Sequence, residues 1–353
     1  GPMSVMAQLE HRLKDIESYF TSIKLPHQPL SSAALDAVAK KFSDVRGLRL
    51  RSQQRTVDLM KKSTNSGLPF FTKRRNVVQD TLPVQIFNKD MSMLSDDTHW
   101  RLACILGWRG QEGGPNISDI KQRVIWMYPM PLNIAEDQCY GPLIQQCQRH
   151  ELVPAWVSND LVDQRITSLF DTKGPDDLVI CTDFDKFDQH FNSSLQDAAK
   201  TILGSILTSN EVETSWLENI FPVKYNIPLM IQEGLLVTGP HGMASGSSGT
   251  NADETLAHTA LQYEAALENG STLNPNSMCL GDDGVLSYPG ITVEDVISAY
   301  TKHGLVMNAA KQTADKQYCT YLRRWHHTHY RRGGVCVGVY STCRAIGRLC
   351  YQE

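Results

Sequence analysis

Three aspartates are the residues of this chain best suited to catalysis. Asp183 directly follows a short buried-strand pattern, Leu178–Thr182, and Asp282 and Asp283 occupy a turn between two further strand patterns. If these strands are neighbours in one sheet, the three carboxylates converge, and their repulsion favours binding of a hard cation such as Mg²⁺. Two such ions activate a hydroxyl and stabilise the leaving oxygen in phosphoryl transfer. An Asp-Asp pair alone is most often a solvated turn, so this prediction depends on the strands around it.

Further polar residues accompany these aspartates along the chain. Asp188 could accept a hydrogen bond from a sugar hydroxyl, although a salt bridge is the simpler interpretation. The segment from Ser245 to Asn251 is rich in Gly and Ser and precedes a helix, where backbone N–H groups can approach a phosphate or a template closely; a flexible linker shows the same composition. Basic residues that could hold a triphosphate or donate a proton to a leaving pyrophosphate are Lys121, Arg123 and Lys311.

The elements that must position these residues follow a β, α, β, β, α, β order. That order predicts a ferredoxin-like sheet backed by helices, with inserted segments left aside. The expected strands are 178–182, 278–280, 285–288 and 305–307, and the expected helices are 193–207, 251–268 and 292–303. Upstream, the pattern predicts helices at 5–19, 33–42, 55–62 and 134–150, a strand at 123–128, and breaks at 66–69 and 107–115.

Composition indicates a folded, soluble protein. The chain has 353 residues, of which 41% are hydrophobic and 20% charged, which excludes disordered and low-complexity classes. No stretch reaches the roughly 18–20 apolar residues that a membrane span needs, so we expect no membrane segment. The nine cysteines form no C-x-x-C pair, which favours reduced thiols and a cytosolic protein.

Charge is distributed unevenly. The net charge of −4 argues against a nucleic-acid partner, yet eleven basic residues lie between Lys40 and Arg75, against two acidic ones. Seven more lie between Lys316 and Gln352, with no acidic residue. Basic flanks around an acidic middle suit a protein that binds both phosphates and divalent cations, but solvated helix faces would give the same pattern. A cluster of His326, His327 and His329 with Cys319 and Cys336 fits no usual zinc spacing and could equally be exposed or face RNA.

Taken in order, three motifs resemble motifs A, B and C of viral RNA-dependent RNA polymerases. They are Asp183-x4-Asp188, Ser245-Gly-x3-Thr250-Asn251 and Gly281-Asp-Asp283, the GDD motif. Residues 64–69 are similar to the motif near the template entrance, 121–125 to the basic fingertip motif, and 304–311 and 321–325 to motifs D and E. Residues 187–190, 72–75 and 337–341 look most like the picobirnavirus and partitivirus group of double-stranded RNA viruses.

The resemblance implies an α+β right-hand polymerase that replicates and transcribes a viral RNA genome. The expected division is an N-terminal region with fingers (1–175), palm (176–192), a fingers insertion (193–238), palm (239–328) and the start of a thumb (329–353). The thumb is expected to be either truncated or unusually small. A reverse transcriptase-like palm polymerase and a non-catalytic RNA-binding protein of a virion are the alternatives. Asp188 and Asn251 are residues that accept a ribose 2′-hydroxyl, which disfavours the former, and three converging carboxylates disfavour the latter.

The resemblance also implies roles for individual residues and for partners. Two Mg²⁺ or Mn²⁺ ions would be held mainly by Asp183 and Asp282, with Asp283 as a secondary ligand, and Lys311 would serve as the proton donor. Expected partners are the RNA template and product, NTPs and the viral capsid protein, in the virion interior and host cytoplasm. Nucleotide contacts are expected from Lys121, Arg123, Asp188, Ser245, Thr250 and Asn251, and RNA contacts from Gly67, Lys73, Arg74, Arg75, Gly246, Arg323 and Arg324.

Overall fold

The computed structural model describes residues 8–111 and 121–350. Its central element is a four-stranded antiparallel sheet in the order β11-β6-β10-β9. The strands are β6 (Val179–Thr182), β9 (Met278–Leu280), β10 (Asp283–Leu286) and β11 (Thr313–Asp315). Three of the four expected strands are present, and the β, α, β, β, α, β order is confirmed.

The predicted fourth strand at 305–307 is wrong. This segment is a loop, and β11 replaces it at the sheet edge, beside β6. Leu305 is buried in the core, and the carbonyl oxygen of Val306 accepts one hydrogen bond from the backbone N–H of Asp185. The apolar residues 305–307 therefore contribute to core packing, and a single backbone hydrogen bond is too little to pair this segment with a strand.

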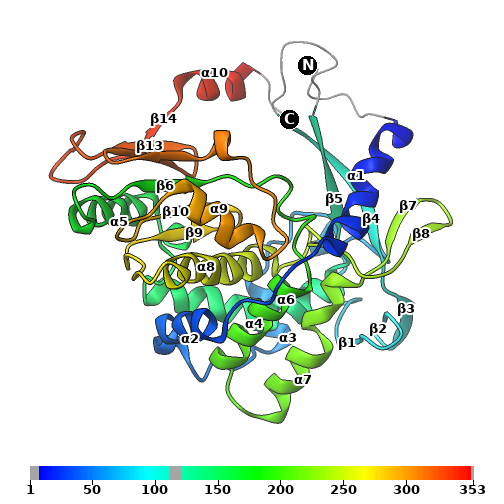
Figure 1. Ribbon diagram of the computed structural model, residues 1–353. Helices are drawn as coiled ribbons and strands as arrows, with labels where there is room; N and C mark the ends of the chain where they lie inside the picture. The colour runs from blue at the N-terminus through cyan, green and yellow to red at the C-terminus, as the bar shows by residue number, and fades with distance from the viewer. Residues whose placement is uncertain (1–7, 112–120, 351–353) are drawn as a thin grey trace.

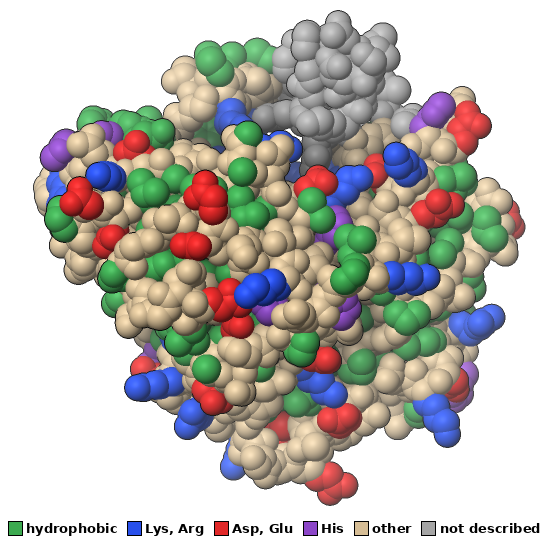
Figure 2. All heavy atoms as spheres, in the orientation of Figure 1, with side chains coloured by type: hydrophobic (Ala, Val, Ile, Leu, Met, Phe, Trp, Pro, Cys, Tyr) green, Lys and Arg blue, Asp and Glu red, His purple; other side chains and the backbone are tan. Residues whose placement is uncertain are grey.

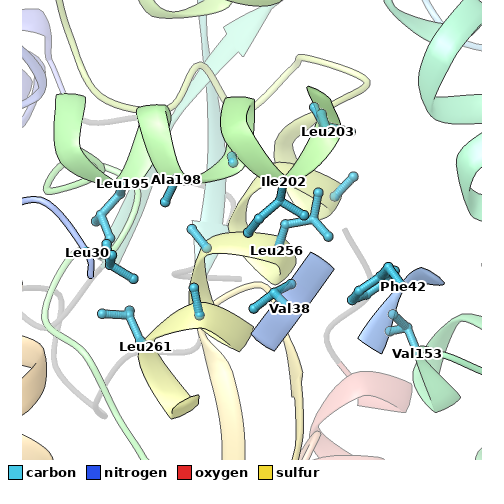
Figure 3. Close-up of a cluster of buried hydrophobic side chains, with 14 of the residues drawn as sticks. Leu30, Val38, Phe42, Val153, Leu195, Ala198, Ile202, Leu203, Leu256 and Leu261 are labelled. Carbon is cyan, nitrogen blue, oxygen red and sulfur yellow. The ribbon is translucent and has the colours of Figure 1, made fainter. Parts of the chain in front are cut away.

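Three helices pack around this sheet: α6 (Ser193–Ile206), α8 (Thr250–Glu268) and α9 (Val293–Thr301). Helix α8 lies between α6 and α9 and also contacts α2 (Ser32–Lys41). Figure 3 shows the apolar contact surface, where Ile202 of α6, Leu256 of α8 and Val38 of α2 meet. The N-terminal region is thus packed directly on the helix that supports the sheet.

Local capping explains where these helices begin. The side chain of Asn192 accepts hydrogen bonds from the first turn of α6, and Thr292 does the same for α9, where Glu294 and Asp295 also favour the positive end of the helix dipole. The predictions for α6 and α8 are confirmed within one residue, and α9 ends two residues earlier than expected.

A second four-stranded sheet has the order β5-β4-β7-β8. Its strands are β4 (Cys104–Gln111), β5 (Lys121–Met127), β7 (Leu229–Gln232) and β8 (Leu235–Val237). Figure 1 shows β4 and β5 as a long ribbon beside α1. The predicted break at Gly107 is wrong, because Gly107 pairs with Ile125 within this ribbon; residues 112–120 of the predicted break lie outside the described residues.

The remaining elements surround these two sheets (Figure 1). No helix among the described residues is long and apolar enough to cross a membrane. The helices are α1 (Leu9–Thr21), α3 (Gln53–Leu59), α4 (Met130–Arg149), α5 (Asn159–Thr172), α7 (Glu211–Asn219) and α10 (Thr342–Cys350), and the strands are β1 (Val84–Phe87), β2 (Ser92–Ser95), β3 (Thr98–Arg101), β12 (Tyr318–Tyr321), β13 (Arg324–His327) and β14 (Val339–Tyr340).

Candidate active site

A cavity of about 860 Å³ opens at the end of β6 and the β9–β10 turn. Asp183, Asp282 and Asp283 all line it, so the structure brings together the three carboxylates that the sequence singled out. Strand register explains why: Gly284 of β10 pairs with Thr182 of β6, and continuing this antiparallel register by one residue places Asp283 opposite Asp183.

Helix α8 fixes the turn that carries Asp282. The backbone N–H of Gly281 donates to Thr255 Oγ1 at 3.0 Å, and the carbonyl oxygen of Gly281 accepts from His258 Nδ1 at 2.8 Å. Gly281 has a φ of +58°, a conformation that glycine adopts without strain. At Gly284 a Cβ would lie 2.6 Å from the His258 ring, so only glycine allows β10 to pack this closely on α8.

The site raises the pKa of two of its aspartates. The pKa of Asp283 rises to about 7, mainly through burial and then through the charges of Asp282 and Asp183, although a 2.8 Å hydrogen bond from the Leu322 backbone N–H to its Oδ2 favours the ionised form. The Asp282 side chain is open to the cavity, yet the surrounding protein raises its pKa too, through desolvation and then the charge of Asp188. Both pKa shifts arise first from burial and are increased by the charges of neighbouring carboxylates.

The donor set fits Mg²⁺ or Mn²⁺. Carboxylate oxygens are the ligands that these hard cations prefer, and a bound cation would stabilise the ionised carboxylates against both burial and their mutual repulsion. Within residues 8–111 and 121–350, no group of three or more His, Cys, Asp or Glu side chains forms a ready-made metal cage. Mg²⁺ is usually bound by one or two carboxylates together with substrate phosphates and water, so the site suits ions that are completed by a nucleotide.

Basic side chains share this cavity. Arg123 of β5, Lys311 of the short 3-10 helix Ala309–Lys311 and Arg323 of the β12–β13 turn line it together with the aspartates. Arg123 and Arg323 lie far apart in sequence, and of the two basic flanks only the C-terminal one, which contains Arg323, reaches the cavity. The backbone of Lys121 begins β5, but its side chain lies outside the described part of the chain. Figure 2 shows positive and negative side chains interspersed over one face of the molecule, with no large single-sign patch.

Asp188 and Asn251, both expected to contact the nucleotide, each have a protein partner in the structure. Asp188 shares a hydrogen bond with the buried Glu254 of α8, whose pKa is raised well above its usual value, first by burial and then by the charge of Asp188. Asn251 Oδ1 accepts a hydrogen bond from Trp156 Nε1 at 2.7 Å. The structure therefore places Glu254, rather than Asn251, against Asp188. Sequence analysis missed Glu254; its signal was the spacing of three residues from Asn251, which puts both on one face of a helix.

The loop before α8 is tied to β5. The backbone N–H of Trp126 donates to Ser245 Oγ at 3.3 Å, and a Cβ at position 246 would lie 1.9 Å from the Trp126 carbonyl oxygen, so Gly246 permits this contact. Thr250 Oγ1 donates to the carbonyl oxygens of Ala244 and Ser247, each at 3.1 Å. The hydroxyl of Thr250 therefore joins the start of α8 to the preceding loop at Ala244 and Ser247.

The predicted RNA contacts fall into two groups. Lys73, Arg75 and Arg323 are exposed, whereas the guanidinium groups of two other arginines already have protein acceptors. Arg74 donates to Asn133 Oδ1 at 2.9 Å, and Arg324 forms a bidentate pair with Asp163 at 2.9 and 3.0 Å. We expect these two to stabilise local structure. A Cβ at Gly67 would lie 2.5 Å from the Tyr128 carbonyl oxygen, so this glycine lets its loop pack on the end of β5.

The histidine and cysteine cluster gives no zinc site among the described residues. His326 is fully buried, and its Nδ1 lies 3.1 Å from the carbonyl oxygen of Cys336. Cys319 and Cys336 are also buried, whereas His329 is exposed. The cluster therefore divides between core and surface.

Comparison with known proteins adds independent information. The model of the family described as viral RNA-dependent RNA polymerase matches residues 4–336. A potential RNA-dependent RNA polymerase of a human picobirnavirus is 56% identical over 355 residues, covering 100% of this chain and 66% of the relative. The RNA-directed RNA polymerase of Cryptosporidium parvum virus 1 is 26% identical over 272 residues, which cover 74% of this chain and 51% of the relative. The chain thus spans about two thirds and one half of these curated relatives.

Solved structures give the same picture. A crystal structure of the RNA-dependent RNA polymerase of a human picobirnavirus superimposes with a TM-score of 0.98 at 56% identity, over 100% of this chain and 68% of the other. The crystal structure of an insertion-loop deletion mutant of a human picobirnavirus polymerase gives a TM-score of 0.97, over 99% of this chain and 69% of the other. The agreement in fold extends over the whole described chain.

Proposed function

Because the chain belongs to the viral RNA-dependent RNA polymerase family, in its picobirnavirus group, we propose that it carries out template-directed synthesis of RNA from NTPs to replicate and transcribe a viral genome. The right-hand polymerase fold that the motifs predicted is confirmed by the match to crystal structures. The observation that carries the proposal is the convergence of Asp183, Asp282 and Asp283 on one cavity that also contains Arg123 and Lys311.

The proposed chemistry is transfer of a nucleotide to an RNA 3′-hydroxyl with release of pyrophosphate. Polymerases of this family generally need divalent metal ions. Two ions, when bound, lower the pKa of the attacking hydroxyl and neutralise charge on the phosphates. Asp183 and Asp282 would hold them, and Asp283 would be a secondary ligand because Leu322 already occupies one of its oxygens.

Basic residues bind and orient the triphosphate in this proposal. Arg123 lies in the cavity and can form charge-assisted hydrogen bonds to phosphate oxygens. Lys121 begins the same strand and is proposed as its partner. Lys311 is exposed at the cavity wall and is placed to give a proton to the leaving pyrophosphate.

We propose that Asp188 reads the ribose 2′-hydroxyl. Its contact with Glu254 orients its carboxylate, and a site that hydrogen-bonds a substrate hydroxyl rejects the analogue that lacks it. Asn251 lies at the start of the same helix, and Trp156 fixes its amide. Asn251 is therefore the second candidate for sugar recognition.

RNA would follow the exposed basic residues and the loop before α8. Lys73, Arg75 and Arg323 provide positive charge for the phosphate backbone. Ser245 and Gly246 are partly exposed at the loop, where they can contact the template. We further propose that the viral capsid protein is a partner and that the enzyme works in the virion interior and host cytoplasm; co-purification with virions tests this.

Primer extension by the purified chain tests the proposed activity. A primed RNA template is incubated with Mg²⁺ or Mn²⁺ and one NTP at a time, and we expect incorporation only of the NTP complementary to the next template base. Equal or better use of the matching dNTP would indicate a reverse transcriptase-like enzyme. RNA binding without any extension would indicate a binding protein and contradict the proposal.

A further inference from the structure

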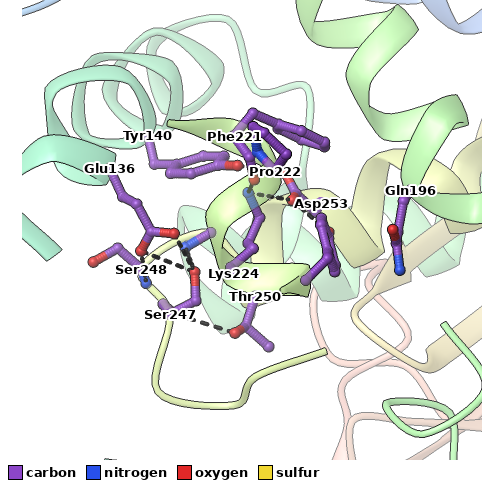
Figure 4. A network of polar contacts seen from close by, with 12 residues as sticks. Glu136, Tyr140, Gln196, Phe221, Pro222, Lys224, Ser247, Ser248, Thr250 and Asp253 are labelled. Atoms are coloured by element: carbon purple, nitrogen blue, oxygen red, sulfur yellow. Dashed lines mark hydrogen bonds and ion pairs between the residues drawn. The ribbon is translucent and has the colours of Figure 1, made fainter. Parts of the chain in front are cut away.

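Helix α4 carries a polar stripe that the proposed mechanism does not use. Asn133, Glu136, Asp137 and Tyr140 have the i, i+3, i+4, i+7 spacing that places side chains on one helix face. This face lies against the loop Ser245–Gly249 and the start of α8, as Figure 4 shows for Glu136 and Tyr140. Asn133, Glu136 and Tyr140 are buried, which is unusual for polar side chains unless they have partners.

Glu136 is the centre of this contact. Its two carboxylate oxygens accept hydrogen bonds from Ser247 Oγ at 2.9 and 2.8 Å, and Oε1 also accepts from the Ser248 backbone N–H at 3.1 Å. The Tyr128 hydroxyl donates to Oε2 at 2.9 Å. All three partners can be donors, and the lone pairs of the two carboxylate oxygens can accept from all of them, although burial raises the pKa of Glu136 to about 7.

Neighbours on the same helix face complete the contact. Asn133 Nδ2 donates to the Gly246 carbonyl oxygen at 3.2 Å and to Ser248 Oγ at 2.9 Å. A Cβ at Gly249 would lie 2.4 Å from the Tyr140 ring, so the loop backbone rests directly on α4. Ser247 and Gly249 are therefore buried against the helix, whereas Ser245 and Gly246 stay partly exposed.

We propose that Glu136 is the positioning residue of the Ser245–Gly249 loop. By holding Ser247 and the Ser248 amide against α4, Glu136 keeps the neighbouring Ser245 and Gly246 in the orientation that faces the RNA. Any movement of the loop along a template has to break or stretch these bonds to Glu136. This inference rests on the proposed function, because it assigns the fixed loop to RNA binding.

The test compares Glu136→Gln with Glu213→Gln. Glutamine has nearly the same shape, but its NH₂ group is a donor, so only one side-chain oxygen remains to accept the bonds that Ser247, Ser248 and Tyr128 share between two oxygens in the wild type. Glu213 is a matched control: it is also buried, and its Oε1 accepts a backbone N–H bond, from Leu50 at 3.1 Å, at a site that does not involve the loop. Four quantities are measured: hydrogen exchange of residues 245–249, affinity for a primed RNA template, and kcat and KM for nucleotide addition.

In Glu136→Gln we expect exchange in residues 245–249 to increase about tenfold, the effect of losing one hydrogen bond to a charged group. RNA affinity and kcat should fall by a similar factor, while KM for the NTP changes little. Glu213→Gln should leave all four quantities at their wild-type values even if its melting temperature falls. Unchanged exchange in Glu136→Gln, or equal effects in both variants, would overturn the proposal.

Ser247→Ala provides a second, independent test in case Glu136→Gln folds poorly. It removes the bonds between Ser247 and Glu136 from the loop side, together with the 3.0 Å bond that Ser247 Oγ accepts from the Gly249 backbone N–H. We therefore expect at least the same increase in exchange, and the effect of the double variant should be smaller than the sum of the two single effects. Fully additive effects would contradict the pairing. Because hydrogen exchange needs no catalysis, it separates failure of this inference from failure of the proposed polymerase activity.

Discussion

The carboxyl groups near the cavity differ in how the protein holds them. Asp283 is fixed by the Leu322 backbone N–H, Asp188 by the buried Glu254, and Asp282 stays open to the cavity. Burial, and then the charge of Asp188, raise the pKa of Glu254 well above its usual value, which favours the neutral form that can donate to Asp188. Glu254 therefore acts as a neutral donor, a role that an amide could also fill.

Substitutions of Glu254 test this role at the level of substrate choice. We expect Glu254→Ala to narrow the ratio of kcat/KM for ATP over dATP by about tenfold, because Asp188 loses its partner and its orientation. Glu254→Gln should keep the ratio near the wild-type value, since glutamine donates the same bond. The measurement is single-nucleotide incorporation on one template; a ratio that is unchanged in Glu254→Ala would show that Asp188 and Glu254 do not read the sugar.

The sequence could identify the three aspartates that line the cavity but could not identify the contact partner of every predicted site residue. Asp183, Asp282 and Asp283 follow strand and turn patterns, which are local signals. The contacts of Arg74 with Asn133 and of Arg324 with Asp163 join residues 59 and 161 positions apart. Charge and spacing cannot distinguish such an arginine from one that binds RNA, because the distinction depends on the acceptor that the fold brings near.

Among the elements, α8 supports the site most directly. Thr255 and His258 hold the Gly281 backbone, and the His258 ring packs on Gly284. The helix was predictable from its length and pattern, whereas the fourth strand was not. Residues 305–307 have the composition of a strand, but pairing partners decide the matter, and β6 pairs with residues 313–315 instead.

A methyl group at position 284 should disturb this packing. In Gly284→Ala the new Cβ would lie 2.6 Å from the His258 ring and 2.9 Å from Thr182 Oγ1, so we expect a loss of about 2 kcal/mol in the free energy of unfolding, together with lower activity. Gly347→Ala on α10 is the control, because its Cβ would meet nothing within 4 Å. Urea denaturation measures the free energy of unfolding of both variants. Equal stability of the two would disprove the close contact of Gly284 with His258.

His258 of α8 should make the stability of the protein depend on pH. Burial lowers the pKa of His258 to about 4, against about 6.5 in the unfolded chain. The folded state then binds fewer protons between these values, so the contribution of His258 to stability is present above about pH 6.5 and is lost as the pH falls toward 4. From pH 7 to pH 5 we expect wild type to lose about 2 kcal/mol more than His258→Asn, whose amide can still donate to Gly281. Equal losses by urea denaturation would exclude this role.

At the scale of the whole molecule, basic residues from distant parts of the chain meet at one cavity. Arg123 reaches it from the N-terminal half, and Arg323 reaches it from the C-terminal half. Of the two basic flanks, the run from Lys316 to Gln352 contributes Arg323 to the cavity, whereas no residue of the run from Lys40 to Arg75 lines it. The fold was predictable for the palm elements; the β1–β3 and β12–β14 sheets, built from short strands, were not.

Salt dependence of RNA binding tests the exposed basic residues. If Lys73 and Arg75 each contact a phosphate, Lys73→Ala with Arg75→Ala should reduce the slope of log affinity against log salt by about 1.4 for single-stranded RNA. Arg74→Ala should leave the slope unchanged and lower stability, because its partner is Asn133. A slope that changes with Arg74 and not with the exposed pair would reverse this assignment.

The central claim is that the aspartate cluster catalyses nucleotide addition, and Asp282→Asn tests it most directly. The measurement is the rate of nucleotide addition on a primed RNA template in wild type, Asp282→Asn and the control Asp185→Asn, which alters an exposed aspartate that does not line the cavity. We predict that Asp282→Asn lowers kcat by about 100-fold or more while folding and RNA affinity are retained, and that Asp185→Asn stays near wild type. Polymerisation by Asp282→Asn at a near wild-type rate would contradict the account.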